Sequence, residues 1–205
     1  IPASAMLTGP LEPTNDAYAI AKLAGVLHIQ GYRREYRRRW ISAMPTNLYG
    51  PGDNFDLETS HVLPALIRRF DDAVRTGADT VTLWGSGTPR REFLHVDDAA
   101  SALIHLLECY DGTEPVNVGT GEDVPIAQLA HLIADTVGYN GAITWDTTRP
   151  DGAPRKLLDI SPLRTTGWNP TTTLADGIRT TLAWYREHGA GGQADPSSDK
   201  GERWQ

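Results

Sequence analysis

Tyr18 and Lys22 lie four residues apart in a segment with the apolar spacing of a helix. Residues four apart on a helix share a face, so the phenol and the ammonium can point into one site. A nearby cation favours the phenolate and lowers the pKa of a tyrosine from about 10 toward the working range of a general acid or base. Such a pair can give a proton to a carbonyl oxygen while a hydride reaches its carbon. The alternative is a tyrosine and a lysine on a solvated helix face.

Charge and cysteine content exclude several classes of protein. The chain of 205 residues carries 19 Lys and Arg against 26 Asp and Glu, a net charge of −7, which disfavours duplex binding and predicts no nucleic-acid partner. The one cysteine, Cys109, excludes an intrachain disulfide and a multi-cysteine zinc site, and we expect no bound metal. We expect Cys109 to be a small buried residue of an apolar helix.

Cellular location can be predicted from the same features. A single cysteine is typical of a reducing compartment. No apolar run approaches the roughly 18 residues of a membrane span, and residues 1–10 lack the basic and apolar regions of a signal peptide. We therefore predict a cytoplasmic protein without a membrane partner.

Helical and strand patterns alternate along the chain. Apolar residues recur at helical spacing between Pro13 and about Arg39, a short buried strand follows over Trp40–Met44, and residues 45–54 are rich in turn formers. The further expected helices cover 62–74, 97–110, 126–137 and 174–185, and the further expected strands cover 81–84, 93–96, 115–118 and 142–145. This alternation predicts an α/β fold, in which ligands bind at the carboxyl ends of the strands. We therefore expect a site in the irregular loop 45–54.

Two local patterns have structural interpretations. Ile20, Leu23, Ala24 and Leu27 form an apolar stripe on the first helix. Gly119-Thr120-Gly121 follows a strand and precedes a helix, but it lacks the third glycine and the downstream acid of a dinucleotide-binding turn. We interpret it as a turn of the sheet.

Several motifs occur in one order. Tyr18-Ala19-Ile20-Ala21-Lys22 is followed one strand later by Pro45-Thr46-Asn47-Leu48-Tyr49-Gly50-Pro51. This arrangement resembles the extended short-chain dehydrogenase/reductase family of nucleotide-sugar enzymes. The segments that are further similar to the GDP-L-fucose synthases of that family are 54–55, 60–70, 83–98, 117–121 and 150–159. The resemblance extends from Leu11 to about His188.

The resemblance implies a fold and a domain organisation. We expect the C-terminal part of a Rossmann-like doubly wound sheet together with a smaller α/β substrate-binding region. Residues 1–58 would be the remainder of the NADP-binding Rossmann domain. Residues 59–188 would form mainly the substrate-binding region, with strands and helices that return to the Rossmann sheet. Residues 189–205, rich in Gly, Ser, Asp and Lys, are predicted to be a flexible tail.

The resemblance also implies catalytic and cofactor-binding roles. In that family the tyrosine is the catalytic acid/base and the lysine is both catalytic and a ligand of the nicotinamide ribose, which implies these roles for Tyr18 and Lys22. His61 matches the family's epimerisation acid and is also implied in cofactor binding. The alternative for His61 is a histidine at a helix start that is hydrogen-bonded to the backbone. The loop residues implied to contact NADP are Pro45, Thr46, Asn47 and Leu48.

Arg69 and Arg91 match the family's substrate-binding arginines. A guanidinium with two parallel donors suits the diphosphate of a nucleotide sugar. Arg68 and Arg90 are their neighbours in sequence and could be confused with them.

Trp84 and Asp151 complete the implied substrate site. Trp84 ends a predicted strand and could stack on a sugar or base, with a core tryptophan as the alternative. Asp151 resembles a substrate-contacting residue of the Pro-Asp-Gly loop, with an ordinary turn aspartate as the alternative.

The implied activity is an NADP-dependent epimerisation and reduction. The family members that these motifs resemble invert C3 and C5 of GDP-4-keto-6-deoxy-D-mannose and reduce C4 with NADPH to give GDP-L-fucose, and in full length they pair as homodimers. The chain lacks the Gly-rich cofactor loop and the catalytic serine and cysteine that the family places upstream, so we expect a fragment that is inactive alone. Two alternatives stay open: another nucleotide-sugar epimerase or dehydratase of the family, and a non-catalytic remnant that binds a GDP-sugar.

Overall fold

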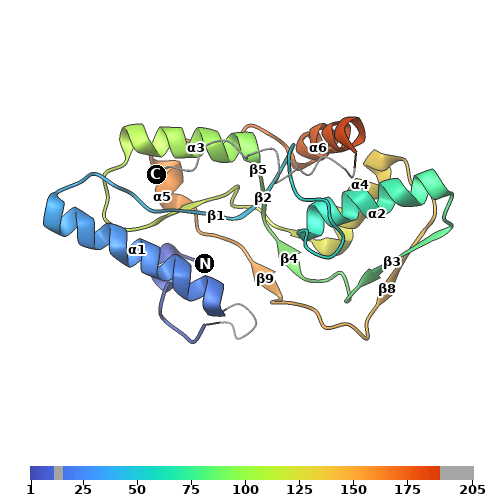
Figure 1. Cartoon of the computed structure of the whole chain (residues 1–205), viewed down its shortest axis with the longest axis horizontal. Helices are drawn as coiled ribbons and strands as arrows, with labels where there is room; N and C mark the ends of the chain where they lie inside the picture. Colours follow the sequence, from blue (N-terminus) through green and yellow to red (C-terminus); the bar gives the residue numbers. More distant parts are fainter. Residues whose placement is uncertain (12–15, 190–205) are drawn as a thin grey trace, which may run out of the picture. The chain divides into compact units, whose positions relative to one another are not determined.

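The computed structural model describes residues 1–11 and 16–189. Helices and strands alternate along the chain, in the order that Figure 1 shows. The helices are η1 Ala3–Ala5, α1 Asp16–Tyr36, α2 Val62–Thr76, α3 Val96–Cys109, α4 Ile126–Val137, α5 Ser161–Thr165 and α6 Leu174–His188. The strands are β1 Ala43–Pro45, β2 Asn47–Tyr49, β3 Thr80–Trp84, β4 Arg90–Arg91, β5 Phe93–His95, β6 Val116–Val118, β7 Val124–Pro125, β8 Ala142–Asp146 and β9 Arg155–Lys156. The predicted α/β fold is confirmed.

Parts of two predictions fall on residues that the structure does not describe. Pro13, the predicted start of the first helix, lies outside the described residues, and α1 is described from Asp16. The predicted flexible tail lies outside them as well, except for Gly189.

The chain divides into two compact units, each built from three separate segments. The first unit contains Ile1–Leu48, Arg90–Val124 and Ala153–Thr172, and the second contains Tyr49–Pro89, Pro125–Gly152 and Thr173–Gln205. The domain boundaries predicted from the family, at residues 58 and 188, stay a prediction.

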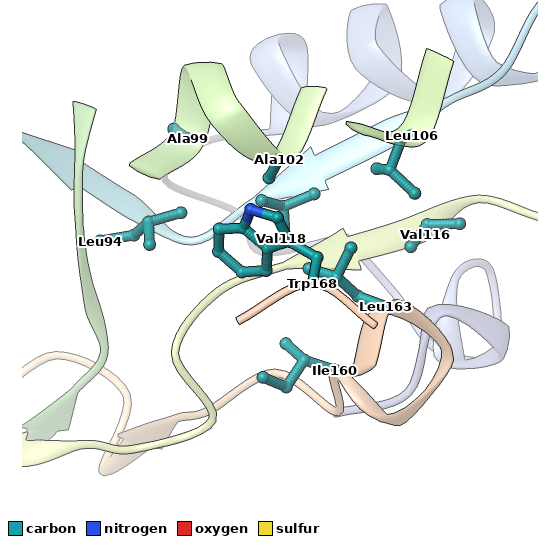
Figure 2. Close-up of a cluster of buried hydrophobic side chains, with 9 residues drawn as sticks. All are labelled: Leu94, Ala99, Ala102, Leu106, Val116, Val118, Ile160, Leu163 and Trp168. Carbon is teal, nitrogen blue, oxygen red and sulfur yellow. The ribbon is translucent and has the colours of Figure 1, made fainter. Parts of the chain in front are cut away.

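The core of the first unit lies between α3 and the parallel pair β1–β6. Ala43 is opposite Val116 and Pro45 is opposite Val118 in that pair. The buried core residues are Leu94, Ala99, Ala102, Leu106, Val116, Val118, Ile160, Leu163 and Trp168. Figure 2 shows Trp168 among them, below Ala102 of α3 and above Ile160. The indole nitrogen of Trp168 donates a hydrogen bond to Ser101 Oγ at 3.1 Å, so the one polar atom of this ring has a partner.

The second unit is built on the parallel pair β3–β8, with α2 against β3 and α4 packed between α2 and α6. The buried residues of α2 recur every three or four positions, which is the spacing of an apolar helix face. They are Leu63, Pro64, Leu66, Ile67, Phe70 and Ala73. Gly77 ends the helix in the left-handed conformation, at φ +68°, and its N–H donates to the carbonyls of Ala73 and Val74. Helix α2 therefore packs against β3 and supports this strand from one side.

The prediction of an irregular loop over residues 45–54 is partly wrong. Asn47–Tyr49 form strand β2, which pairs with β5. Turn-forming residues indicate only a local conformational preference. Pairing with β5, which is distant in sequence, overrides that preference at Asn47–Tyr49.

The prediction for Cys109 is wrong. Cys109 is exposed, not buried. It is the last residue of α3, and the buried residues of that helix end one turn earlier, at Leu106. The apolar spacing continues to the last residue of the helix, but the residues of the helix after Leu106 are not buried.

Candidate active and substrate-binding residues

The structure brings Tyr18 and Lys22 together on α1. The ammonium nitrogen of Lys22 lies 5.4 Å from the centroid of the Tyr18 ring. Tyr18 is 60% exposed, and α1 has no buried residue. The two side chains therefore share an accessible helix face, as their spacing predicts, and their catalytic roles stay predictions.

The apolar stripe of α1 is also accessible in this chain. Ile20 is 56% exposed and Leu27 is 50% exposed. The homodimer implied by the family resemblance stays a prediction.

The predicted cofactor-contacting residues Pro45, Thr46, Asn47 and Leu48 run from the end of β1 into β2. The N–H of Thr46 donates to the carbonyl of Val118 at 2.9 Å. The Asn47 side-chain amide donates to the carbonyl of Glu92 at 2.7 Å, and the Thr46 hydroxyl donates to the same oxygen at 3.3 Å. The carboxyl end of β1, where a ligand is expected, is therefore fixed by hydrogen bonds to two other segments of the first unit.

The side chain of Glu92 organises the Gly-Thr-Gly turn. Glu92 is fully buried, and its Oε1 accepts the N–H groups of Thr120 and Gly121, both at 2.7 Å. Its Oε2 accepts the N–H of Leu158 at 2.9 Å. A Cβ at Gly119 would collide with this carboxylate, which explains the glycine there. Because a carboxylate of the chain itself occupies the amides of the turn, the geometry supports its interpretation as a turn of the sheet rather than a phosphate site.

His61 lies at the start of α2, the position expected under the alternative of a helix-start histidine. It is the residue before the first helical turn, but its side chain makes no capping hydrogen bond. Burial raises the pKa of Asp53 in the preceding loop, against the opposing effects of the Asn54 N–H and of His61. No hydrogen bond to the helix start therefore holds the imidazole of His61.

Trp84 lies at the carboxyl end of β3, directly opposite Asp146 at the end of β8. It is 65% exposed, which excludes the alternative of a core tryptophan. The guanidinium carbon of Arg69, from α2, is 5.9 Å from the centroid of the indole ring system. The guanidinium carbon of Arg149, from the loop after β8, is 5.1 Å from it. Both distances are in the range of cation–π contacts.

Asp151 connects the two loops that follow β3 and β8. Its Oδ2 accepts the hydroxyl of Ser86 at 2.6 Å, and its Oδ1 accepts the N–H of Ser86 at 2.9 Å. These bonds, the hydroxyl first, lower the pKa of Asp151, so it is charged at neutral pH. Gly85 has φ +80°, and a Cβ there would collide with this carboxylate. Asp151 is thus more than a local turn residue, since it ties one loop to the other.

Arg68 and Arg69 have different environments. Arg68 donates to the carbonyl of Phe55 at 3.0 Å and lies 3.7 Å from Asp72. Arg69 forms no ion pair with any residue that the structure describes, and its guanidinium faces Trp84. The predicted substrate arginine is therefore the member of this pair that is available to a ligand.

Arg90 and Arg91 divide in the same way. Arg90 pairs with Asp123, Nε to Oδ1 at 2.8 Å, and Arg155 pairs with the other oxygen of that carboxylate. Arg91 donates to the carbonyl of Arg90 at 2.8 Å and makes no ion pair within the described part of the chain. Arg91, predicted to bind substrate, keeps an uncompensated charge.

The predicted site residues fall in both units. Tyr18, Lys22, residues 45–48 and Arg91 belong to the first, whereas His61, Arg69, Trp84 and Asp151 belong to the second. Within the described residues, no group of three or more His, Cys, Asp and Glu side chains could hold a metal ion. None of the described helices has the length and apolarity needed to cross a membrane.

Known families provide an independent comparison. A sequence model of the NAD dependent epimerase/dehydratase family matches residues 1–119. The chain belongs to this family. The match includes Tyr18, Lys22, the cofactor-loop residues and His61, so these candidates lie within the part of the chain that defines membership.

Individual members of the family give closer matches. GDP-L-fucose synthase 1 of Arabidopsis thaliana is 55% identical over 185 residues, which cover 90% of this chain and 57% of that protein. GDP-L-fucose synthase of Escherichia coli (strain K12) is 50% identical over 194 residues, which cover 90% of this chain and 60% of that protein. A structure of a GDP-L-fucose synthetase from Naegleria fowleri bound to NADP has a TM-score of 0.86 at 31% identity, over 92% of this chain and 61% of the other. The chain thus spans somewhat more than half the length of the relatives it matches.

The structure adds residues that the sequence analysis did not single out. Glu92, Ser86 and Arg149 each contact a predicted site residue or the segment that holds one. Glu92 had a detectable signal, because a glutamate beside the apolar strand Phe93–His95 is costly to bury unless its carboxylate is hydrogen-bonded. Ser86 and Arg149 had none, since each depends on which strands lie side by side.

Proposed function

We propose that this chain is part of an NADP-dependent epimerase/reductase that converts GDP-4-keto-6-deoxy-D-mannose to GDP-L-fucose. The observation that carries the proposal is the 55% identity to a GDP-L-fucose synthase over 90% of the chain. The geometry supports it, because the residues implied in substrate binding include an accessible aromatic ring and two arginines without ion-pair partners among the described residues.

Substrate binding is proposed to use opposite charge and stacking. Arg69 binds the diphosphate through paired N–H donors, a geometry that matches phosphate oxygens, and Arg91 supplies a further positive charge for the substrate. Trp84 offers an exposed ring face to a sugar or base. Asp151 accepts hydrogen bonds from hydroxyl groups of the sugar, and Ser86 holds its carboxylate in place.

Epimerisation is proposed to proceed through the acidity of the protons beside the C4 ketone. One group removes the proton from C3 or C5, and the electron pair of the broken C–H bond moves toward the ketone oxygen. His61 then returns a proton to the carbon from the opposite face, which inverts it. A histidine suits this step because its ordinary pKa lies near neutral pH. The absence of a helix-capping bond to the His61 ring supports this assignment.

Reduction is proposed to use the pair on α1. Tyr18 donates its phenolic proton to the C4 oxygen, and the nearby ammonium of Lys22 stabilises the phenolate that is left. NADPH, when bound, supplies the hydride for C4. Lys22 and residues 45–48 fit the nicotinamide end of that cofactor, because the lysine is accessible and the loop lies at the carboxyl end of a parallel strand. The amides of the Gly-Thr-Gly turn do not fit its phosphates, because Glu92 occupies them.

Titration calorimetry of the 205-residue chain with GDP tests the substrate site, with circular dichroism to establish that each variant is folded. We expect GDP to bind, and Arg69→Ala to weaken binding about tenfold or more because a charge-assisted contact is lost. Arg179→Ala is the matched control: this exposed arginine of the same unit pairs with Asp176, its one ion-pair partner among the described residues. UDP as a second ligand tests the alternative of another nucleotide sugar. A folded chain that binds no GDP, or binds UDP as tightly, contradicts the proposal.

The catalytic roles are tested in a protein that contains this chain and turns the keto-sugar over. Tyr18→Phe should abolish NADPH oxidation, because the phenylalanine has no proton to give. His61→Gln should abolish inversion at C3 and C5, measured by NMR of the sugar product. Unchanged reduction in the first variant would refute the role of Tyr18, and unchanged inversion in the second would refute the role of His61. GDP binding by a folded protein without any NADPH oxidation would favour the non-catalytic remnant.

A further inference from the structure

Arg149 makes a second, unassigned contact with the Trp84 ring. Its guanidinium carbon lies 5.1 Å from the ring centroid, closer than that of Arg69 at 5.9 Å. Trp84 and Asp146 are opposite each other at the ends of two parallel strands, so the loop that carries Arg149 begins beside the indole. We call Arg69, Trp84 and Arg149 the Trp84 cluster.

Arg149 is held toward the ring by its own loop. Its Nε lies 3.9 Å from Asp146 Oδ2, while Asp146 Oδ1 accepts the N–H and the hydroxyl of Thr148. Two residues further on, Asp151 fixes the loop to Ser86. The position of Arg149 over the indole is therefore set at both ends of a short segment.

The charges around the ring leave the two guanidinium groups undercompensated. Within the described residues, Arg69 has no ion-pair partner and Arg149 has only the long contact with Asp146. Asp151, two residues along the loop, accepts both of its hydrogen bonds from Ser86 and forms no ion pair with either arginine within the described residues. Two like charges within 6 Å of one ring centroid repel each other, and an anion with two charged groups relieves that repulsion better than a single phosphate does.

We propose that Arg149 is a specificity-determining residue of this site, which adds a second positive charge beside Trp84 and so selects a diphosphate over a monophosphate. This inference rests on the proposed function for the location of the substrate, and it adds to that function a residue and a preference. Arg149 binds one phosphate group of the diphosphate while Arg69 binds the other, and both guanidinium groups lie within 6 Å of the centroid of the indole ring system.

The experiment uses the 205-residue chain and follows the indole N–H signal of Trp84 by NMR, assigned by its loss in Trp84→Phe. Without any ligand, Arg149→Ala should shift this signal, because a cation leaves the ring. Arg179→Ala is the control, since Arg179 has the same i, i+3 spacing to an aspartate and similar exposure, 65% against 59%. An unchanged signal in Arg149→Ala would overturn the proposed contact.

Titration with inorganic pyrophosphate and with orthophosphate then tests the preference. We expect pyrophosphate to bind the unmodified chain at least tenfold more tightly than orthophosphate, and Arg149→Ala to remove most of that difference. Arg149→Lys should recover part of the affinity, because it keeps the charge but not the planar fork. Equal affinity for the two anions, or a lysine variant no better than the alanine variant, would overturn the proposal.

GDP and GMP distinguish failure of this inference from failure of the proposed function. If GDP binds and the ratio of GDP to GMP affinity is the same in Arg149→Ala, the inference fails and the proposed function stands. If pyrophosphate shows the predicted dependence on Arg149 but GDP binds no better than pyrophosphate, the inference stands and the guanosine part of the proposed function fails.

Discussion

Glu92 offers a quantitative test of how the first unit is held together. Its fully buried carboxylate accepts three backbone N–H groups from two segments, those of Thr120 and Gly121 at Oε1 and that of Leu158 at Oε2. Its carbonyl accepts the side chains of Thr46 and Asn47, and a substitution would leave those two bonds in place. The perturbation can therefore be confined to the carboxylate.

The expected cost follows from the number of donors that lose a partner. Hydrogen bonds to charged groups contribute about 1.5–3 kcal/mol each, and a buried donor left unsatisfied costs about 1–3 kcal/mol. In Glu92→Gln the amide NH₂ replaces Oε2, so it faces the N–H of Leu158, and we expect a loss of about 1.5–3 kcal/mol. In Glu92→Ala all three donors lose their acceptor. Because the donor residues are partly accessible to water, we expect each lost bond to cost an amount near the lower end of the range for an unsatisfied donor. The three together should then cost about 3–5 kcal/mol.

Urea unfolding followed by circular dichroism measures both losses. A cost of about 3–5 kcal/mol is a large share of the roughly 5–15 kcal/mol of a typical domain, so the alanine variant should unfold at much lower urea. Glu122→Gln, at an exposed glutamate next to the same turn, is the control and should change stability by less than about 0.5 kcal/mol. If Glu92→Gln were as stable as the unmodified chain, the carboxylate would not hold the turn.

Three further stability measurements test other parts of the structure. Gly85→Ala should cost more than Gly77→Ala: both glycines have positive φ, but only at Gly85 would a Cβ collide with another residue, so equal losses in urea would contradict the predicted collision. Burial alone would raise the pKa of Asp98, but hydrogen bonds from two threonines outweigh burial and lower that pKa. This carboxylate therefore stabilises the fold above about pH 4, and the stabilisation is lost as pH falls through its folded pKa. Asp98→Asn should make stability fall less steeply at acid pH, and an unchanged acid dependence would refute this. Leu163→Ala, at a fully buried core position, should cost about 2–5 kcal/mol in urea unfolding, and a smaller loss would mean that the core there is not tightly packed.

The long elements could be predicted from the sequence because their signals are local. α4 covers the predicted residues 126–137 without a shift, since its apolar spacing is regular and Gly138 ends it in the left-handed conformation. The two-residue strands β4 and β9 could not be predicted, because they are made of charged residues without any alternation. They pair in parallel, and Asp123 binds an arginine from each. That pairing joins segments more than 60 residues apart.

Part of the candidate site was also open to prediction. In β3 the exposure alternates, with Val81 and Leu83 buried and Thr80, Thr82 and Trp84 exposed. Successive residues of a strand point to opposite faces, so the two apolar β-strand residues already place Trp84 on the other face from the core. The contact of Arg149 with this ring had no such signal, because it depends on the register that puts Trp84 opposite Asp146.

The arginine pairs show most clearly what the fold adds to the family resemblance. Neighbouring residues on a helix point about 100° apart, and neighbouring residues on a strand point to opposite faces, so each pair must divide between two environments. In both pairs the first arginine is fixed by an acceptor of its own unit, Phe55 O for Arg68 and Asp123 for Arg90. The second, Arg69 or Arg91, has no ion-pair partner in the described part of the chain. Consecutive arginines therefore let one side chain hold the local structure while the next keeps a free charge for a phosphate. Because both residues of each pair are arginines, the two roles could be exchanged only by shifting the helix or strand along its register, not by substituting a residue.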